Sequence, residues 1–440
     1  MNFTRLVKYG AIGLTGILAL TGCSAGQAQE EIKLVTEVSE PVTLDFWHAL
    51  SGYNGEVLNE IVEDFNETVG EEKGITVVPT FQGSYSDNKS KVMASLKAGN
   101  APDIVMGTNN DIYEYVSNGF AMNLDEYIYN GEIGMYGEEY SLEDIYSVFR
   151  EDSKSYTENG DYYSLPFSKS TDLLFYNKTF FEEHGLKVPQ TWEEVVEVSK
   201  QITEITKKAS FSIDNTSNHF ITMMKQLGGE YTNKDGEVLF NNETGKYVLE
   251  LTRENIENGN WRTAGEDIYS STAFTNGLVQ MYVGSSAGAS FLENDNFEWA
   301  AVPSPQWDLE NPHYISQGNN VAVIKSSTST SDEVYGSYEF IKYLVGHEAN
   351  LKWSTETGYL PVRKSVSESE EYQTIMNEDS SKQAAVSSVE NGFIEALFAN
   401  GSLSSNIVRT QVGVMVDEVI STDVDIQDLL DQTEYRLNSY

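Results

Sequence analysis

Apolar and polar residues alternate near position 42, and apolar residues then recur at helical spacing. Val42, Leu44 and Phe46 alternate as in a half-buried strand, and a second apolar run spans residues 75–78. Between them, the apolar residues that fall three and four positions apart are Leu58, Ile61, Val62 and Phe65. This order predicts a β-α-β unit that starts near Pro41.

The next segment extends the same pattern. Val92, Met93 and Leu96 predict a further helix that ends at Gly99, and residues 103–106 predict a third buried strand. Strands joined through helices assemble into a parallel sheet with right-handed crossovers. The beginning of the chain is therefore expected to be α/β.

A second α/β block follows further along the chain. Residues 173–176 read as a strand, and residues 191–194 (TWEE) form a capping box that opens a helix. Short apolar strands are expected at 279–283 and 321–324, and Ser331 is expected to cap a helix. The C-terminal third is expected to be largely helical.

The N-terminus has the pattern of a bacterial lipoprotein signal. Arg5 and Lys8 precede an apolar stretch over 11–20, which is too short to span a bilayer, and L-T-G-C follows. We expect residues 1–22 to be a signal peptide and Cys23 to be lipidated. Residues 23–40 would be a flexible tether at the extracellular face of the membrane, as in Gram-positive lipoproteins, so that only the lipid contacts the membrane.

Composition narrows the classes of function. The net charge is −40, with 68 acidic and 28 basic residues, which repels nucleic acid and excludes a nucleic-acid-binding role. This acidity is typical of a saline or alkaline habitat, although solubility alone also explains it. Cys23 is the single cysteine and the five histidines form no H-x-x-x-H pair, so we expect no disulfide, no metal and no cofactor.

Several separated motifs together resemble the extracellular solute-binding proteins of bacterial ABC importers, the sugar-type family, and most closely its glycerol-3-phosphate-binding branch. In chain order the motifs are 46–48 (FWH), 83–85 (GSY), 99–103 (GNAPD), 166–171 (PFSKST), 176–178 (YNK), 191–192 (TW), 273–277 (AFTNG) and 357–362 (TGYLPV). The resemblance implies an α/β fold with two lobes, each a sheet flanked by helices, and a ligand cleft between them. Lobe 1 would take 41–174 plus 316–356, and lobe 2 would take 175–315 plus 357–440.

The resemblance also implies where ligand contacts lie. Tyr85 and Ser170 match ligand-binding residues of the branch, and Asn109 stands where the branch has a glutamate. Tyr359 lies in T-G-Y-L-P-V, and Arg409 precedes V-D-E at a spacing longer than in the branch. Asn215 and Asn218 stand where the branch carries two tryptophans.

Further candidates come from their positions beside strands. His48 ends the first strand and could face the cleft. Ser285 or Ser286 follows the strand 279–283, and Gly318 precedes the strand at 321, where main-chain N–H groups could reach ligand oxygens.

These residues predict a binding protein without chemistry of its own. We expect a monomer that captures an extracellular carbohydrate and delivers it to the permease subunits of an ABC importer. Asn215 and Asn218 carry amides where the branch has aromatic rings that could stack on a ligand, and the chain is strongly acidic. Both features favour a neutral ligand with many hydroxyl groups. The alternative ligand is glycerol 3-phosphate or a glycerophosphodiester.

Two enzymatic alternatives stay open at the level of sequence. Residues 284–288 (GSSAG) fit the nucleophile elbow of α/β-hydrolases, with Ser286 as the nucleophile and His313 or His347 as the later base. A glycosidase with paired carboxylates is also conceivable, because 68 acidic residues allow many pairings. Labelling of Ser286 by a fluorophosphonate, or sugar release from an oligosaccharide, would identify these activities.

Overall fold

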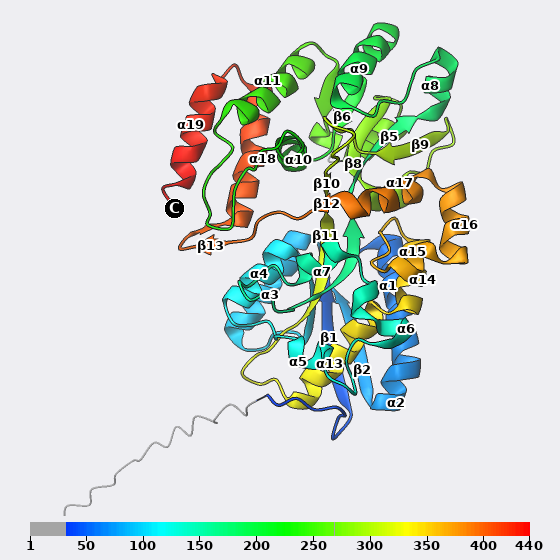
Figure 1. Ribbon diagram of the computed structural model, residues 1–440, viewed down its shortest axis with the longest axis vertical. Helices are drawn as coiled ribbons and strands as arrows, with labels where there is room; N and C mark the ends of the chain where they lie inside the picture. The colour runs from blue at the N-terminus through cyan, green and yellow to red at the C-terminus, as the bar shows by residue number, and fades with distance from the viewer. Residues whose placement is uncertain (1–31, 268) are drawn as a thin grey trace, which may run out of the picture. The chain divides into compact units, whose positions relative to one another are not determined.

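Two five-stranded sheets flanked by helices organise the chain, and they confirm the predicted α/β class (Figure 1). The computed structural model describes residues 32–267 and 269–440. The first sheet consists of β1 (Val42–His48), β2 (Ile75–Phe81), β3 (Ile104–Thr108), β4 (Leu165–Ser170) and β11 (Gln317–Val323). The second sheet consists of β5 (Asp172–Asn177), β6 (Phe211–Ile213), β7 (Trp261–Thr263), β8 (Met281–Ser285) and β9 (Trp299–Pro303).

The helices fall into two groups according to the sheet that they surround. Around the first sheet lie α1 (Gly52–Phe65), α2 (Glu71–Lys73), α3 (Tyr85–Ala98), α4 (Asn109–Ser117), α5 (Asp125–Ile128), α6 (Gly137–Tyr140), α7 (Ser147–Ser153), α13 (Ser331–Leu344), α14 (His347–Glu356) and α15 (Lys364–Glu368). Around the second lie α8 (Lys178–His184), α9 (Trp192–Thr206), α10 (Thr216–Gln226), α11 (Glu243–Glu257), α12 (Ser270–Thr275), α17 (Ser380–Ser388), α18 (Ser405–Ser421) and α19 (Ile426–Leu437). Helix α16 (Glu370–Glu378) connects α15 to α17.

The predicted β-α-β unit is confirmed. In the first sheet β1 lies between β2 and β3 and pairs with both in parallel, so the chain crosses over through α1 and α3. Gly99 ends α3 in the left-handed conformation, with φ of 79°, as the sequence indicated. The predicted strand at 321 forms part of β11, which runs antiparallel to β3 and β4.

The second α/β block is also present. The strand predicted at 173–176 is β5, and the capping box at Thr191 opens α9, with Glu194 as its reciprocal partner. The predicted cap of α13 was wrong by one residue. Thr330 caps this helix and forms the box with Glu333, whereas Ser331 is the first helical residue.

The chain passes between the two sheets at neighbouring points. Thr171 alone separates β4 from β5, and Ser316 separates β11 from β10 (Tyr314–Ile315), which pairs in parallel with β12 (Gly392–Phe393). The Thr171 hydroxyl donates to the carbonyl of Ile315 at 2.9 Å, which joins the two connections. Strand ends from both sheets are thereby held close together.

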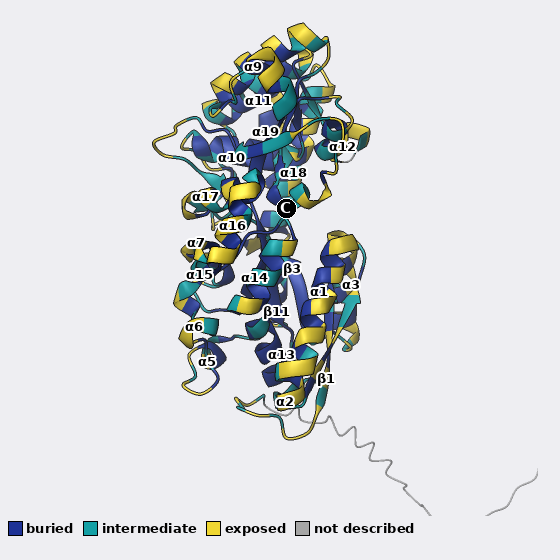
Figure 2. Ribbon diagram, turned by 90° about the vertical axis from the view of Figure 1, so that its right-hand side faces the viewer, coloured by how far each residue is buried: buried dark blue, intermediate teal, exposed yellow. Residues whose placement is uncertain are grey.

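Burial follows the layers of the fold. In Figure 2 the strands β3 and β11 are mostly dark blue, whereas α1 and α9 carry exposed residues, in yellow, along one face. One apolar cluster extends from the first sheet to Phe175 and Tyr282 in the second, and another fills the space between the second sheet, α10, α11 and α18. Within the first cluster the rings of Phe167, Trp353 and Tyr359 stack in sequence, with centroid separations of 4.8 and 5.2 Å.

The segment before β1 is attached to α13. The main-chain N–H of Lys33 donates to Ser331 Oγ, and that of Ser39 donates to Asp332, each at 2.9 Å. In the part of the chain that the structure describes, no helix is both long and apolar enough to cross a membrane.

Candidate functional site

Tyr85 and Tyr359 meet through their phenol groups, and their oxygens are 3.3 Å apart. Ser84 caps α3 and makes Tyr85 its first residue, which leaves the ring 43% exposed. Tyr359 is 7% exposed and stacks on Trp353 at an interplanar angle of 18°. Burial raises the pKa of Tyr359 well above its usual value, so its hydroxyl stays protonated near neutral pH and can both donate and accept hydrogen bonds.

Asn319 extends this pair toward the first sheet. Its amide nitrogen donates to the Tyr85 hydroxyl at 3.4 Å and to Ser168 Oγ at 3.1 Å. The side-chain oxygen of Asn319 is buried and has no hydrogen-bond partner within the described residues. It is therefore an acceptor that a bound hydroxyl could satisfy.

Asn109, the first residue of α4, belongs to a neighbouring polar network. Its oxygen accepts hydrogen bonds from the Tyr156 hydroxyl at 2.8 Å and from the Asn320 amide at 2.7 Å, and its nitrogen donates to Asp152. Asp152 also forms an ion pair with Lys169, and both of these side chains are buried. Both polar atoms of Asn109 thus have protein partners.

Ser170 and Gly318 lie at adjacent rungs where β4 pairs with β11. Ser170 is 4% exposed and faces Gln317 in the ladder, and Gly318 faces Lys169. Gly318 has φ of +101°. The main chain of β4 fills the place that a side chain on Gly318 would take, so the glycine allows the close pairing of the two strands here.

Ser285 ends β8 opposite Asp172 of β5, and its hydroxyl accepts a hydrogen bond from the N–H of Ala287 at 3.3 Å. This contact caps the 3₁₀ helix η4 (Ser286–Phe291). Ser285 is consequently placed at the same edge of the second sheet as the start of β5.

Arg409 lies on α18 and has partners on both sides. Its guanidinium forms an ion pair with Glu395 and donates to the side-chain oxygen of Asn218. The Asn218 amide donates in turn to Asp172 at 3.1 Å, and Gln317 donates to the other oxygen of Asp172 at 2.7 Å. Burial raises the pKa of Asp172 to about 6, against the opposing effect of these two hydrogen bonds.

His48 ends β1 but is enclosed by its neighbours. It is 2% exposed, and its ring lies 5.7 Å from that of Phe46 and 6.1 Å from that of Phe81. Burial lowers the pKa of His48 to about 4, against a smaller opposing main-chain hydrogen bond with Leu50. The imidazole is therefore uncharged at neutral pH.

The structure joins most of the predicted residues into two connected sets. Tyr359, Tyr85, Asn319, Asn320 and Asn109 form the first set, by hydrogen bonds and by adjacency in β11. The second set is a chain of hydrogen bonds from Gln317 to Asp172, from Asp172 to Asn218 and from Asn218 to Arg409. Gly318 is the neighbour of Gln317 in β11. His48 belongs to neither set through these hydrogen bonds, and Cys23 lies outside the described residues.

Sequence reasoning missed several members of these sets. They are Asp152, Lys169, Asp172, Asn319, Asn320 and Glu395. Two signals could have identified four of them, Lys169, Asp172, Asn319 and Asn320: charged residues within the largely apolar stretch around P-F-S-K-S-T-D, and two asparagines directly before V-A-V-I.

Ser286, the possible hydrolase nucleophile, is engaged with the main chain. It is 2% exposed, and its hydroxyl accepts a hydrogen bond from the N–H of Thr171 at 3.3 Å. His313 and His347, its candidate bases, contact Asn311 and Ser365 instead. Over the described ranges, no three or more His, Cys, Asp or Glu side chains are grouped to hold a metal ion.

Comparisons with known proteins agree with the architecture. The family model of bacterial extracellular solute-binding proteins matches residues 60–379. The sn-glycerol-3-phosphate-binding periplasmic protein UgpB of Brucella melitensis is 26% identical over 378 residues, which cover 82% of this chain and 80% of that protein.

Two solved structures share the fold. UgpB from Mycobacterium tuberculosis in complex with glycerophosphocholine has a TM-score of 0.79 at 19% identity, over 91% of this chain and 98% of that chain. The ABC substrate-binding protein Lmo0181 from Listeria monocytogenes in complex with cycloalternan has a TM-score of 0.77 at 18% identity, over 91% of this chain and 99% of that chain. The resemblance drawn from the motifs is confirmed, and the chain belongs to the family of bacterial extracellular solute-binding proteins.

Proposed function

We propose that this protein binds a neutral carbohydrate outside the cell and delivers it to the permease subunits of an ABC importer. The two lobes would be 41–174 plus 316–356 and 175–315 plus 357–440, with the sugar held between them. The proposed contacts are Tyr85, Asn109, Ser170, Ser285, Gly318, Tyr359, Arg409 and His48. Closure of the lobes would bury the ligand and present one conformation to the permease.

The observation that carries the choice of ligand is the charge around Arg409. Its guanidinium is already paired with Glu395, and the buried carboxylate of Asp172 lies behind Asn218. A phosphate would need uncompensated positive charge in a buried site. Hydroxyl groups need only donors and acceptors, which the unpartnered side-chain oxygen of Asn319 and the phenols of Tyr85 and Tyr359 offer.

A second candidate ligand is glycerol 3-phosphate or a glycerophosphodiester. The name of the Brucella relative favours it, because that protein binds sn-glycerol 3-phosphate. In this chain Asn109 stands in place of the glutamate of that branch and contacts Asp152, so the surroundings differ. The two ligand classes are separated by the experiment below.

The protein would act as a monomer anchored through a lipid on Cys23, after removal of residues 1–22. Residues 23–40 would connect the lipid to the folded part, and the contacts of Lys33 and Ser39 with α13 would fix the end of that connection. No catalytic step is assigned, since Ser286 hydrogen-bonds to the main chain at Thr171.

A thermal-shift screen of the purified chain tests the ligand. Glucose, galactose, maltose, melibiose, maltotriose, raffinose, glycerol 3-phosphate and glycerophosphocholine are added in turn, and calorimetry measures the affinity of each compound that raises the melting temperature. A ligand at 100 times its dissociation constant stabilises the folded state by about 2.7 kcal/mol. Stabilisation by phosphorylated compounds alone would contradict the carbohydrate proposal.

A further inference from the structure

The turn Thr357–Gly358 carries Tyr359 into the candidate site. Thr357 is the C-cap of α14, and its hydroxyl accepts a hydrogen bond from the N–H of Tyr359 at 3.2 Å. On the other side of Tyr359, the N–H of Leu360 donates to the carbonyl of Lys169 in β4 at 2.7 Å. The place of the Tyr359 ring therefore depends on how this turn is held.

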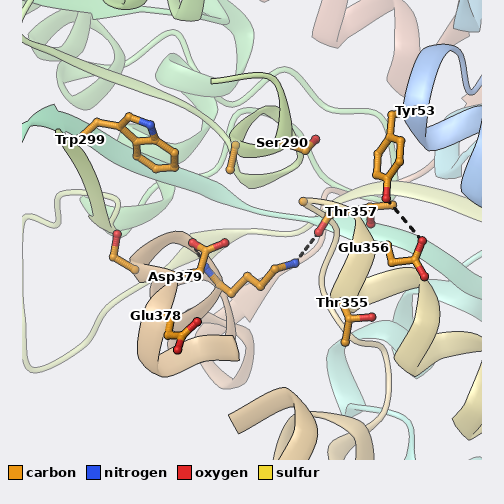
Figure 3. A pocket seen from close by; sticks show the side chains of 12 residues that line it. Tyr53, Ser290, Trp299, Thr355, Glu356, Thr357, Glu378 and Asp379 are labelled. Atoms are coloured by element: carbon orange, nitrogen blue, oxygen red, sulfur yellow. Dashed lines mark hydrogen bonds between the residues drawn. The ribbon is translucent and has the colours of Figure 1, made fainter. Parts of the chain in front are cut away.

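Helix α17 supplies a cation to the turn. The Lys382 ammonium donates to the main-chain carbonyls of Ser354 and Thr357, and a dashed line in Figure 3 marks the contact with Thr357. Carbonyls in the last turn of a helix have no partner within the helix and lie at the negative end of its dipole, so an ammonium suits this position. Lys382 thus caps α14 from a different helix.

This cap joins helices that pack on different sheets. Helix α14 is attached to the first sheet, where Trp353 stacks on Phe167 of β4 at a centroid separation of 4.8 Å. Helix α17 is attached to the second sheet, because Ser380 Oγ accepts a hydrogen bond from the N–H of Ala301 in β9 at 3.0 Å. The contact of Lys382 with the turn therefore spans the two halves of the fold.

A second contact fixes the turn from the same side. A Cβ atom on Gly358 would lie 2.8 Å from the main-chain oxygen of Ser286 and 2.9 Å from that of Ala287, so the turn packs directly on η4. This 3₁₀ helix follows β8 of the second sheet. Both residues of the turn are thus held by elements of the second sheet, whereas Leu360 is held by the first.

Lys382 is charged in these contacts at neutral pH. The residue is 9% exposed, and burial lowers its pKa to about 8, against the attraction of Asp379. A charged donor forms a stronger hydrogen bond to a carbonyl than a neutral donor does. Removal of the ammonium should therefore loosen the turn more than the loss of two ordinary hydrogen bonds would.

We propose that Lys382 is a positioning residue for ligand binding, because it fixes Thr357 and thereby holds the Tyr359 ring where it can contact the ligand. Tyr359 stacks on Trp353 and meets the Tyr85 hydroxyl, so a shift of the turn would misalign its own hydroxyl. This inference rests on the proposed role of Tyr359 as a ligand contact, and it adds a residue outside the site that controls affinity.

Binding measured at pH 7 tests this role. Calorimetry titrates the wild type with maltotriose, raffinose and glycerophosphocholine, and the compound that binds most tightly is then used with the variants. We expect Lys382→Met to bind it at least about fivefold more weakly, which corresponds to about 1 kcal/mol. Lys382→Arg keeps a charged donor, and the adjoining cavity of about 510 Å³ has room for the longer side chain, so we expect an affinity within about twofold of the wild type.

Lys342→Met separates positioning from stability. Lys342 is also buried, but it lies in α13 and donates to the carbonyl of Ile133 and to Glu339, which keeps Lys73 as a partner in the variant. This variant should lose stability, as Lys382→Met does, but should bind the ligand as the wild type does. Equal affinities of the two methionine variants would overturn the positioning role of Lys382.

Hydrogen exchange gives a readout that needs no ligand. The N–H groups of Tyr359 and Leu360 are both hydrogen-bonded, so their exchange reports on the turn. We expect exchange in the segment 357–362 to be faster in Lys382→Met and close to the wild-type rate in Lys382→Arg. Unchanged exchange in Lys382→Met would contradict the proposal. If glycerophosphocholine alone binds, or no compound does, the carbohydrate function fails, while the exchange rates still decide the role of Lys382.

Discussion

A Cβ atom on Gly318 would lie 1.9 Å from the main-chain carbonyl oxygen of Ser168, so only glycine at this position lets β11 pass this close to β4. The φ of Gly318, +101°, is a second reason for glycine, because side chains disfavour this region. The close approach positions Gln317 and Asn319, the residues on either side, which hydrogen-bond Asp172 and Tyr85.

Gly318→Ala is predicted to destabilise the fold by at least ~3 kcal/mol, since backbone strain and a main-chain collision act together. Gly277→Ala is the matched control. Gly277 also has a positive φ, 65°, but a Cβ there would meet nothing within 4 Å, so we expect a cost of about 1 kcal/mol. Urea unfolding measures the stability of both variants, and equal losses of stability would show that β11 can move away from β4.

Lys382 ties α17 to the end of α14. Its ammonium donates to the main-chain carbonyls of Ser354 and Thr357. Lys382→Met keeps most of the apolar stem but removes both donors, so we expect a loss of about 2 kcal/mol in the free energy of unfolding. The exposed Lys97→Met should change it by less than ~0.5 kcal/mol. A Lys382 variant as stable as the Lys97 variant would mean that these hydrogen bonds add no net stability.

Local signals in the sequence were sufficient for much of the fold. Strict alternation at Val42–Phe46 and the apolar run at 173–176 identified β1 and β5, and the T-W-E-E box identified the start of α9. Short strands of three residues, such as β6 and β7, carry too few positions for a period to be recognised. The adjacent hydroxyls of Thr330 and Ser331 gave two possible caps, and only the geometry selects Thr330.

The candidate site was less accessible to sequence reasoning. The resemblance to the family's motifs indicated binding roles for Tyr85, Tyr359 and Arg409, and the structure places the first two in contact. The acidic residues that offset the positive charge of Arg409 could not be inferred, because Glu395 and Asp172 lie on chain segments far apart in sequence. Their effect depends on burial and distance rather than on any motif.

The uncharged state of His48 predicts a dependence of stability on pH. Its pKa is about 4 in the folded protein and 6.5 in the unfolded chain, so the unfolded chain binds more protons between these values. The contribution of His48 to stability is complete above pH 6.5 and falls by roughly 3 kcal/mol as the pH drops to 4. The raised pKa values of Asp103 and Asp172, both about 6, act in the opposite direction over this range.

Comparison with a variant isolates the contribution of His48 to the pH dependence of stability. The free energy of unfolding is measured between pH 4 and 8 for the wild type and for His48→Asn. We expect the advantage of the wild type to shrink by about 3 kcal/mol toward pH 4. A profile for His48→Asn that runs parallel to that of the wild type would show that His48 is accessible to protons in the folded state.

The pairing of Arg409 with Glu395 predicts that ligand charge can be selected by one substitution. One carboxylate oxygen of Glu395 contacts Arg409, and the other accepts from the Tyr231 hydroxyl at 2.9 Å. In Glu395→Gln the amide oxygen can still accept from Arg409, and the amide nitrogen would donate to the Tyr231 hydroxyl, while the negative charge is removed and Arg409 becomes available to an anion. We expect the affinity for glycerol 3-phosphate to rise by roughly tenfold, about 1.4 kcal/mol, and the affinity for a neutral sugar to change little. Calorimetry measures both, with the exposed Glu390→Gln as the control. Should the wild type bind glycerol 3-phosphate tightly and Glu395→Gln leave that affinity unchanged, the charge of Arg409 would not be what distinguishes the ligands.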